Sequence, residues 1–436
     1  MNEIKKPGII GLIFLIVFVM SHLFSILPGF TCYATSFQPT GNIADVSNSN
    51  TLYLGKSFLR NNVRTFTYGA SGIEVNFSGT ELSANFVLRQ DANHPQRIAI
   101  FLDGKNSPEE AKFMMLNQGD GWYLLASNLP SGNHTIMVLK NDRGNFGRIE
   151  ATEIGISQYA VNAGGFFLPP NPQRSFVIEV FGDSITDGSG IAADQSTPNG
   201  FAFTWANYTG ELARYFNAEI KVMAACGMGL NSSLIAVDGH YVGFVYPQRN
   251  WPVVDEGAGQ NTPYNHTANP ADVVIINLGT NDVPGINNGD FTTTQYRNEY
   301  IRFMREIKTD CPSAYIIGVL GAMDAKELFP HIQAACDTVN AENGSDYAFF
   351  IQLQDSGIIP QGKGYDNCHP SRYANQIYGL QIAKLIQKVV PNAPVVKLPA
   401  TIDPPSSNPT LNKTATISSK IETTNRPASK ENAATR

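Results

Sequence analysis

The sequence predicts an α/β domain preceded by an all-β sandwich domain, because the rhythm of the chain changes between the two. From about Leu52 to Ala160, short alternating runs of apolar and polar residues are separated by turn residues, a pattern typical of an antiparallel sandwich. Beyond residue 172, runs rich in Val and Ile alternate with helical patterns, which indicates a parallel sheet with helical crossovers. With 436 residues, the chain is long enough for two hydrophobic cores.

The N-terminus is typical of an export signal, and we expect a signal peptide over residues 1–34. Lys5 and Lys6 precede the apolar run GIIGLIFLIVFVM, and small residues lead up to a cleavage point after Ala34. The stretch from Ile9 to Leu27 is also about long enough to span a bilayer, so an uncleaved membrane anchor is the alternative. In either case the sequence predicts a protein outside the cytosol, secreted or in the periplasm.

The expected sandwich covers residues 35–165. Five of its runs alternate apolar and polar residues over strand length: GIEVNFSG, ELSANFVL, RIAIFLDG, WYLLAS and HTIMVLK. Turn residues such as Asp103-Gly104 and Pro130-Ser131-Gly132 separate these runs and leave no room for a long helix.

The expected α/β domain covers residues 173–392 and follows a Pro-rich join near residues 169–172. Its predicted strands are Phe176–Phe181, Ile220–Ala225, Val273–Leu278, Tyr315–Leu320 and Tyr347–Leu353. Its predicted helices are Phe201–Phe216, Tyr296–Lys308, Lys326–Asn340 and Ser371–Val389. Residues 394–436 are rich in Pro, Thr, Ser, Asn and Lys without an aromatic residue, which predicts a disordered tail.

Composition narrows the class of partner. A net charge of −6 and the lack of a basic run argue against nucleic acid. No Cys-x-x-Cys or His-x-x-x-His pattern occurs, so the sequence predicts neither a metal ion nor another cofactor. Removal of the leader would leave Cys226, Cys311, Cys336 and Cys368, which allow three disulfide pairings; four buried thiols are the simpler expectation. The oligomeric state stays open.

Polar residues follow three of the expected parallel strands, at the edge where an open α/β sheet places its reactive groups. The first strand ends in GDS with Ser184, the second leads into CGMGLN, and the third ends in GTND with Asn281. The segment GYDNCHPSRYANQIYG then sets Asp366 and His369 in a loop before the last helix.

These residue types are the ones that acyl transfer needs. A serine becomes a nucleophile when a base takes its proton, and imidazole suits that task near neutral pH. In Asp-x-x-His both side chains lie within one turn, so Asp366 can hold Nδ1 of His369 while Nε2 faces Ser184. The backbone N–H of Ser184, a glycine N–H of the second loop and the Asn281 amide are the predicted donors to an oxyanion. Taken singly, each of these residues also fits a plain cap or turn.

The order GDSIT, glycine loop, GTND and DNCHP resembles the SGNH, or GDSL-type, hydrolase family over roughly Phe176 to Val390. The resemblance implies a flavodoxin-like three-layer α/β/α domain. It also implies that Ser184 is the nucleophile, His369 the base and Asp366 the acid, with Asn281 in the oxyanion hole. The glycine of that hole is Gly229 by its late position in the loop, with Gly227 as the alternative. Asp183 is expected to shape the turn.

The sandwich in front of this domain makes the chain similar to the two-domain carbohydrate esterases of family 2. That resemblance implies a jelly-roll domain joined to a hydrolase that removes acetyl groups from polysaccharides, as an acetyl xylan esterase does. We therefore expect a secreted serine esterase whose substrate partner is an acetylated carbohydrate. Its only expected membrane contact is the N-terminal anchor, if that is retained.

Aromatic residues before the GTND strand are candidates for sugar binding. Tyr246, Trp251 and Tyr264 lie in the long segment between the glycine loop and that strand, and aromatic rings stack on the apolar faces of pyranoses. A role in the packing of the loop is the equal alternative. Two other functions stay open: a lipase or thioesterase acting on longer acyl chains, and a non-catalytic carbohydrate-binding protein.

Overall fold

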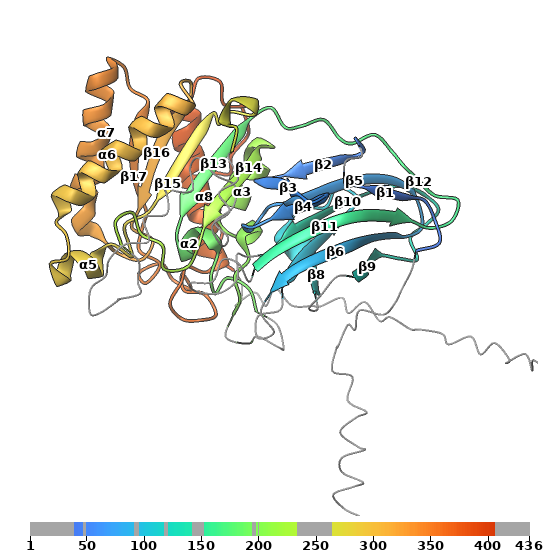
Figure 1. Ribbon diagram of the computed structural model, residues 1–436. Coiled ribbons are helices and arrows are strands. Elements are labelled where there is room, and N and C mark those ends of the chain that lie inside the picture. Colours follow the sequence, from blue (N-terminus) through green and yellow to red (C-terminus); the bar gives the residue numbers. More distant parts are fainter. Residues whose placement is uncertain are drawn as a thin grey trace, which may run out of the picture.

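A computed structural model describes residues 39–46, 49–90, 96–116, 121–141, 152–193, 198, 200–232 and 264–405. It contains a β-sandwich domain and an α/β domain that lie side by side (Figure 1). The expected leader and most of the expected tail lie outside the described residues. None of the helices in the described part of the chain is long and apolar enough to span a bilayer.

The sandwich consists of two antiparallel sheets, which confirms the predicted fold class. One sheet has the order β3 (Ser57–Arg60), β4 (Val63–Phe66), β11 (Thr152–Val161), β6 (Leu82–Gln90) and β9 (Gly121–Ala126), with β1 (Ile43–Asp45) paired to β11. The other has the order β12 (Phe166–Phe167), β5 (Gly72–Gly79), β10 (Gly132–Lys140), β7 (Arg97–Leu102) and β8 (Lys112–Met115), with β2 (Thr51–Leu54) paired to β5.

Alternation along the strands places one face of each sheet in the core between them. In β5, Ile73, Val75 and Phe77 are fully buried, and they meet side chains such as Phe66 and Phe86 from the opposite sheet. This period of two is the pattern that the sequence shows.

The α/β domain is built on five parallel strands in the order β14 (Glu219–Ala224), β13 (Val177–Gly182), β15 (Val273–Asn277), β16 (Tyr315–Leu320) and β17 (Ala348–Gln352). This order, 2-1-3-4-5 along the chain, is the flavodoxin-like one. Every residue of β13, β14 and β15 is buried, as expected for strands that are covered on both faces.

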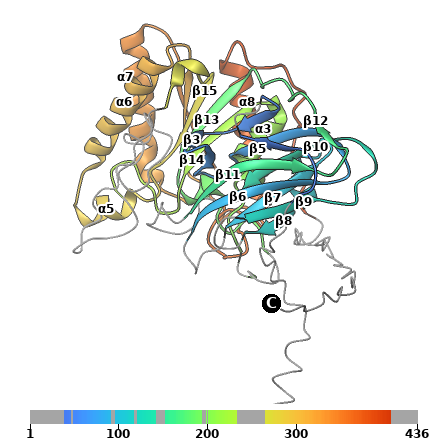
Figure 2. The ribbon, with the colours of Figure 1, turned by 45° about the vertical axis from the view of Figure 1, so that its right-hand side comes forward.

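Helices cover both faces of this sheet and complete the predicted three layers (Figures 1 and 2). On one face α3 (Tyr208–Phe216) packs beside α8 (Arg372–Val389), and on the other α6 (Thr293–Asp310) packs beside α7 (Phe329–Asn343). The short elements are α2 (Ser184–Asp187), α5 (Val283–Asn288) and the 3₁₀ turns η2 (Pro108–Glu110), η4 (Thr204–Ala206), η5 (His266–Ala268) and η6 (Lys326–Leu328).

The helix predicted over residues 201–216 is wrong in its first half. Phe201 forms an extended bridge with Ala192, η4 follows, and α3 starts only after Asn207, whose side chain accepts a hydrogen bond from the N–H of Thr209. Phe201 and Phe203 instead pack against the sandwich residue Phe113, so a contact between domains overrides the local pattern.

The described cysteines are free thiols rather than disulfides. Cys311 and Cys336 are buried, Cys226 is half-buried and Cys368 is exposed. The expectation of four buried thiols is therefore right for two of them only.

Candidate active site

Ser184 lies at the carboxyl edge of the parallel sheet. Strand β13 ends at Gly182, Asp183 caps helix α2 by accepting a hydrogen bond from the N–H of Ile185 at 2.9 Å, and Ser184 is the first residue of that helix. Asp183 thus shapes the turn, as the sequence predicts. Because the first N–H groups of a helix have no partner within it, the Ser184 N–H is left available as a donor.

A cluster of buried polar side chains holds helix α2 in place. The hydroxyl groups of Thr186 and Tyr208 are 2.6 Å apart, and the Asn277 amide nitrogen lies 3.3 Å from each of them. Burial raises the pKa of Tyr208 well above its ordinary value. The phenol therefore stays neutral and holds the helix that carries Ser184.

Asp366 and His369 form a hydrogen-bonded pair. Oδ2 of Asp366 lies 2.6 Å from Nδ1 of His369, and Oδ1 accepts hydrogen bonds from the backbone N–H groups of Cys368 and His369, both at 2.9 Å. Burial of the carboxyl group acts to raise its pKa, but the bond from the imidazole and the two backbone bonds outweigh it and bring the pKa to about 2. An ionised Asp366 keeps the proton of neutral His369 on Nδ1 and leaves Nε2 free to act as a base.

The loop that carries this pair is attached to the segment after Ser184. The N–H of Tyr365 donates to the carbonyl of Gly190 at 2.8 Å, and the N–H of Ser189 donates to the carbonyl of Ser184 at 3.0 Å. The Asp183 carboxyl group also interacts electrostatically with His369. The structure therefore brings the nucleophile candidate and the Asp366–His369 pair to one edge of the sheet.

Gly229 and Asn281 lie at the same edge. The amide nitrogen of Asn281 donates to the carbonyl of Met228 at 2.8 Å and to Oδ2 of Asp183 at 3.2 Å. A Cβ atom on Gly229 would lie 2.8 Å from Oδ2 of Asp282, so no side chain fits at that position. Asn281 thus connects the glycine loop with the turn that carries Ser184.

Asp282 holds the glycine loop in place. Its carboxylate accepts hydrogen bonds from the backbone N–H groups of Leu230, Asn231 and Ser232 at 2.7, 2.6 and 3.2 Å. Burial raises the pKa of Asp282 to about 7, although these three bonds lower it. The sequence pattern gives no role to Asp282, although its place directly after Asn281 in GTND is a signal for one.

Cys226 is a second neighbour of Ser184 that the sequence did not reveal. The side chains of Ser184 and Ser189 lie close enough to its thiol to act on the pKa of that group, which they lower. Burial, followed by the nearby Asp187 and Asp183 carboxyl groups, raises the pKa of the thiol to about 12. Cys226 is therefore a neutral contact of the serine and not a competing nucleophile at neutral pH.

Of the three aromatic residues expected to bind sugar, Tyr246 and Trp251 lie outside the described residues, and Tyr264 lies elsewhere. The Tyr264 ring packs edge-on against His266 with 4.7 Å between centroids, and Nζ of the sandwich residue Lys56 lies 4.4 Å from its centroid. Burial, then Glu179 and Glu219, raise the pKa of Tyr264 above its ordinary value. Because Glu219 is the first residue of β14, Tyr264 sits at the amino end of the sheet, in the domain interface, and not beside Ser184.

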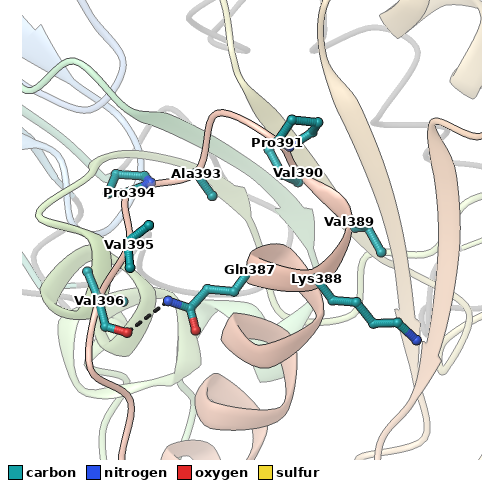
Figure 3. Close-up of a pocket in the computed structure, with 9 residues that line it drawn as sticks. All are labelled: Gln387, Lys388, Val389, Val390, Pro391, Ala393, Pro394, Val395 and Val396. Atoms are coloured by element: carbon teal, nitrogen blue, oxygen red, sulfur yellow. Dashed lines mark hydrogen bonds between the residues drawn. The ribbon is translucent and has the colours of Figure 1, made fainter.

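A hollow among the described residues is also away from this site. It measures about 650 Å³ and lies between the end of α8 and the chain that follows, where the Gln387 side chain donates to the carbonyl of Val396 at 2.9 Å (Figure 3). Helix α8 starts three residues after His369 and is about 27 Å long at 1.5 Å per residue, so its end is remote from the pair. Among the described residues, no group of three His, Cys, Asp or Glu side chains is placed to hold a metal ion.

The comparisons with known proteins match both domains. The sequence model of the GDSL-like lipase/acylhydrolase family matches residues 180–377, and that of the carbohydrate esterase 2 N-terminal domain matches residues 53–170. A search of the curated proteins finds no match.

Solved structures share the fold of both domains. A family two carbohydrate esterase from Cellvibrio japonicus has 19% identity and a TM-score of 0.67, with 80% of this chain and 98% of that chain covered. An acetyl xylan esterase from Butyrivibrio proteoclasticus has 19% identity and a TM-score of 0.66, with the same coverage. A family two carbohydrate esterase from Clostridium thermocellum, in complex with cellohexaose, has 20% identity and a TM-score of 0.64, with 78% and 98% covered. In this order along the chain, residues 53–170 thus match the N-terminal domain of carbohydrate esterase family 2, and residues 180–377 match the GDSL-like lipase/acylhydrolase family.

Proposed function

We propose that this protein is an exported serine esterase that removes acetyl groups from the sugar hydroxyls of polysaccharides or oligosaccharides. The observation that carries the proposal is the Asp366–His369 pair, 2.6 Å apart, on a loop bonded to the segment that follows Ser184. The two family matches support ester hydrolysis and a carbohydrate substrate.

The reaction starts with attack of Oγ of Ser184 on the acetyl carbonyl carbon while Nε2 of His369 takes the hydroxyl proton. The tetrahedral intermediate collapses when the imidazolium gives this proton to the sugar oxygen, which leaves as an alcohol. Water then attacks the acetyl-enzyme with His369 again as base, and acetate and free Ser184 are released. Because its pKa is about 2, Asp366 stays ionised and stabilises the imidazolium in both steps.

Three donors are proposed for the oxyanion: the backbone N–H groups of Ser184 and Gly229 and the side-chain amide of Asn281. Asn281 now donates to Asp183 at 3.2 Å, a longer bond than its bond to Met228 at 2.8 Å. When the tetrahedral intermediate forms, we expect the amide hydrogen of Asn281 that now donates to Asp183 to donate to the oxyanion instead. Loss of one such donor costs about 2.7–4 kcal/mol of transition-state stabilisation.

The relatives support a carbohydrate substrate. The Clostridium thermocellum structure contains cellohexaose, and the Butyrivibrio proteoclasticus protein is an acetyl xylan esterase. For this chain we propose an acetylated plant-type polysaccharide, with Trp251 and Tyr246 as sugar contacts.

The test compares acyl groups and carriers on the full chain. p-Nitrophenyl acetate, p-nitrophenyl octanoate, acetylated xylan and acetylated glucomannan are the substrates, and Ser184→Ala is the control. We expect acetyl esters to be preferred and Ser184→Ala to be inactive on all four. A preference for octanoate would establish a lipase instead, and sugar binding without turnover would establish a binding protein.

Export is tested separately. The full chain is produced in a bacterial host, and the N-terminus of the protein found outside the cytosol is sequenced. A start near Thr35 would support the cleaved leader, while an intact N-terminus in the membrane fraction would establish the anchor.

A further inference from the structure

We infer that the β-sandwich domain is a positioning part of the active site: its residues Asn141 and Phe113 hold a strap that fixes Asp366, and through it His369. The strap is defined as residues 188–193 and 200–204. This inference rests on the proposed function, because it concerns the same Asp366–His369 pair.

The first contact joins the strap to the acid. The Gly190 carbonyl accepts the N–H of Tyr365 at 2.8 Å, and Gly190 has a φ of +68°. A Cβ atom on Gly190 would fall on the Asp366 carboxyl group, 2.6 Å from its Oδ1. The carboxyl group therefore packs directly on the bare Cα of Gly190, so a displaced strap displaces Asp366.

The two stretches of the strap are bonded to each other and to the nucleophile helix. Ala192 and Phe201 exchange backbone hydrogen bonds of 3.3 and 2.6 Å, and the N–H of Phe203 donates to the carbonyl of Gly188 at 3.1 Å. The N–H of Gly188 donates to the carbonyl of Ser184 at 3.0 Å. Helix α2 thus anchors the strap at Gly188, and movement at 200–204 is transmitted through the paired stretches to Gly190 and Asp366.

Asn141, at the end of β10, connects the strap to the sandwich. Its side-chain amide donates to the carbonyl of Ala202, and its own carbonyl accepts the N–H of Thr204 at 3.1 Å. Asn141 is fully buried, so these bonds are shielded from water.

Aromatic packing provides a second connection. The ring of Phe113, in β8, meets Phe201 and Phe203 edge to face at centroid distances of 5.4 and 4.9 Å. The guanidinium group of Arg97, in β7, lies 3.6 Å from the centroid of the Phe201 ring. These contacts fix the strap from the sandwich side.

A strap with this role affects the rate of ester hydrolysis as well as the stability of the protein. Misplacement of a reacting group by about 1 Å costs about 100-fold in rate. We expect a partial loss of support to lower kcat by on the order of 10-fold with little change in KM, because the contacts hold the base and not the substrate.

The test uses Asn141→Ala and Phe113→Leu in the full chain, each with a matched control. Asn162→Ala removes a half-buried Asn whose side chain accepts the N–H groups of Thr80 and Glu81 at 2.7 and 3.2 Å within the sandwich. Phe167→Leu changes a half-buried Phe that packs on the sandwich core alone. kcat on p-nitrophenyl acetate is divided by the number of active sites, counted with a serine-directed phosphonate.

The decisive measurement repeats each variant in an Asp366→Asn background. If the sandwich acts through Asp366, the 10-fold losses shrink towards none there, whereas the two controls stay within about twofold of the parent in both backgrounds. Losses of equal size in both backgrounds, or an unchanged kcat in the single variants, would overturn the inference. Phe113→Leu carries the comparison if Asn141→Ala does not fold. A wild-type protein without esterase activity would refute the proposed function itself, which separates the two failures.

Discussion

At the scale of single residues, two carboxyl groups near Ser184 have opposite environments. Asp366 accepts a bond from the imidazole and two from the backbone, and its pKa falls to about 2. Asp183 is fully buried, and burial raises its pKa to about 7 in spite of the bond from the Ile185 N–H. Asp366 is therefore ionised at neutral pH, while Asp183 changes its charge near neutrality.

The proposed triad predicts strongly non-additive mutant effects. Ser184→Ala and His369→Ala should each lower kcat by at least about 10⁴-fold, and the double variant should be little worse than either, because the residues act as a unit. The loss of kcat in Asp366→Asn should be roughly ten- to a hundredfold smaller than in these two variants, since the acid only orients and stabilises the imidazole. Single-turnover kinetics on p-nitrophenyl acetate measure all four variants. Losses that multiply in the double variant would show that the pair is misassigned.

Asp183 predicts a particular pH dependence of stability. Because its pKa is about 7 in the fold and 3.8 for a free aspartate side chain, the folded state binds the extra proton between these values. Its contribution to the free energy of unfolding therefore falls as the pH rises from about 4 to about 7. In Asp183→Asn, which keeps a residue able to cap α2, this fall should be smaller by on the order of 1 kcal/mol or more.

Urea unfolding at several pH values between 4 and 8 measures the effect. Asp45→Asn, at an exposed position of β1, is the control against which the change in slope for Asp183→Asn is judged. Parallel curves for wild type and Asp183→Asn would contradict the raised pKa.

Single residues were predictable from the sequence where their chemistry is local. Asp366 and His369 are three residues apart, and the structure joins them as expected. The roles of Asp282 and Gly190 depend on loops about 50 and 175 residues away, which no local pattern encodes. For Tyr264 the sequence left sugar contact and packing equally open, because an aromatic residue before a strand looks the same whether it faces a substrate or, as here, the second domain.

At the scale of elements, strands with a strong apolar pattern were predictable from the sequence. The start of one helix and the shortest strands were not. All five parallel strands lie where the Val- and Ile-rich runs predict them. The helix over 201–216 failed because Phe201 and Phe203 are needed by the neighbouring domain. Short strands such as β1, β8 and β12 give no signal in the sequence, since strands of two to four residues have too few positions for a period.

His134 predicts a pH-dependent link between two elements of the sandwich. Nε2 of His134, in β10, lies 2.8 Å from the carbonyl of Pro130, and Nδ1 lies 3.0 Å from Oδ2 of Asp103, in the turn after β7. Both ring nitrogens can donate only in the imidazolium, and the bond to Pro130, followed by Asp103, raises the pKa of His134. The stabilisation is therefore present below the ordinary value of 6.5 and is lost as the pH rises through the folded pKa.

His134→Gln should accordingly lower the free energy of unfolding by about 1 kcal/mol at pH 5.5 and by much less at pH 8.5. His331→Gln, on the half-exposed surface of α7, is the comparison: burial and then Arg297 lower the pKa of His331, so any difference between the two pH values should have the opposite sign. A loss of equal size at both pH values would mean that His134 is held neutral.

At the scale of the whole molecule, the two classes of domain were predictable, but their contact was not. The flavodoxin-like order and the sandwich each follow from patterns within one stretch of chain. The interface depends on single side chains that reach across: Lys56, in the turn between β2 and β3, is fully buried and forms an ion pair with Glu179 in β13. Beside it, the N–H of Gly55 donates to Oε1 of Glu219 at 2.7 Å. In the sequence, Lys56 stands in a short turn of the kind that usually lies at a protein surface. Nothing near it indicates a buried acidic partner in the other domain.

This buried pair predicts that the two domains share their stability. Lys56→Met leaves Glu179 as a buried charge without its ammonium partner and should lower the free energy of unfolding by about 3–5 kcal/mol. Lys56→Met/Glu179→Leu removes both charges and should recover most of that loss, because apolar residues replace buried ion pairs at little net cost. Arg305→Met, which breaks the exposed pair with Glu342, is the matched control and should cost less than about 1 kcal/mol. Urea unfolding followed by circular dichroism and tryptophan fluorescence measures all three. If Lys56→Met proved as mild as Arg305→Met, the pair would not link the domains, and their contact would depend on other residues such as Asn141 and Phe113.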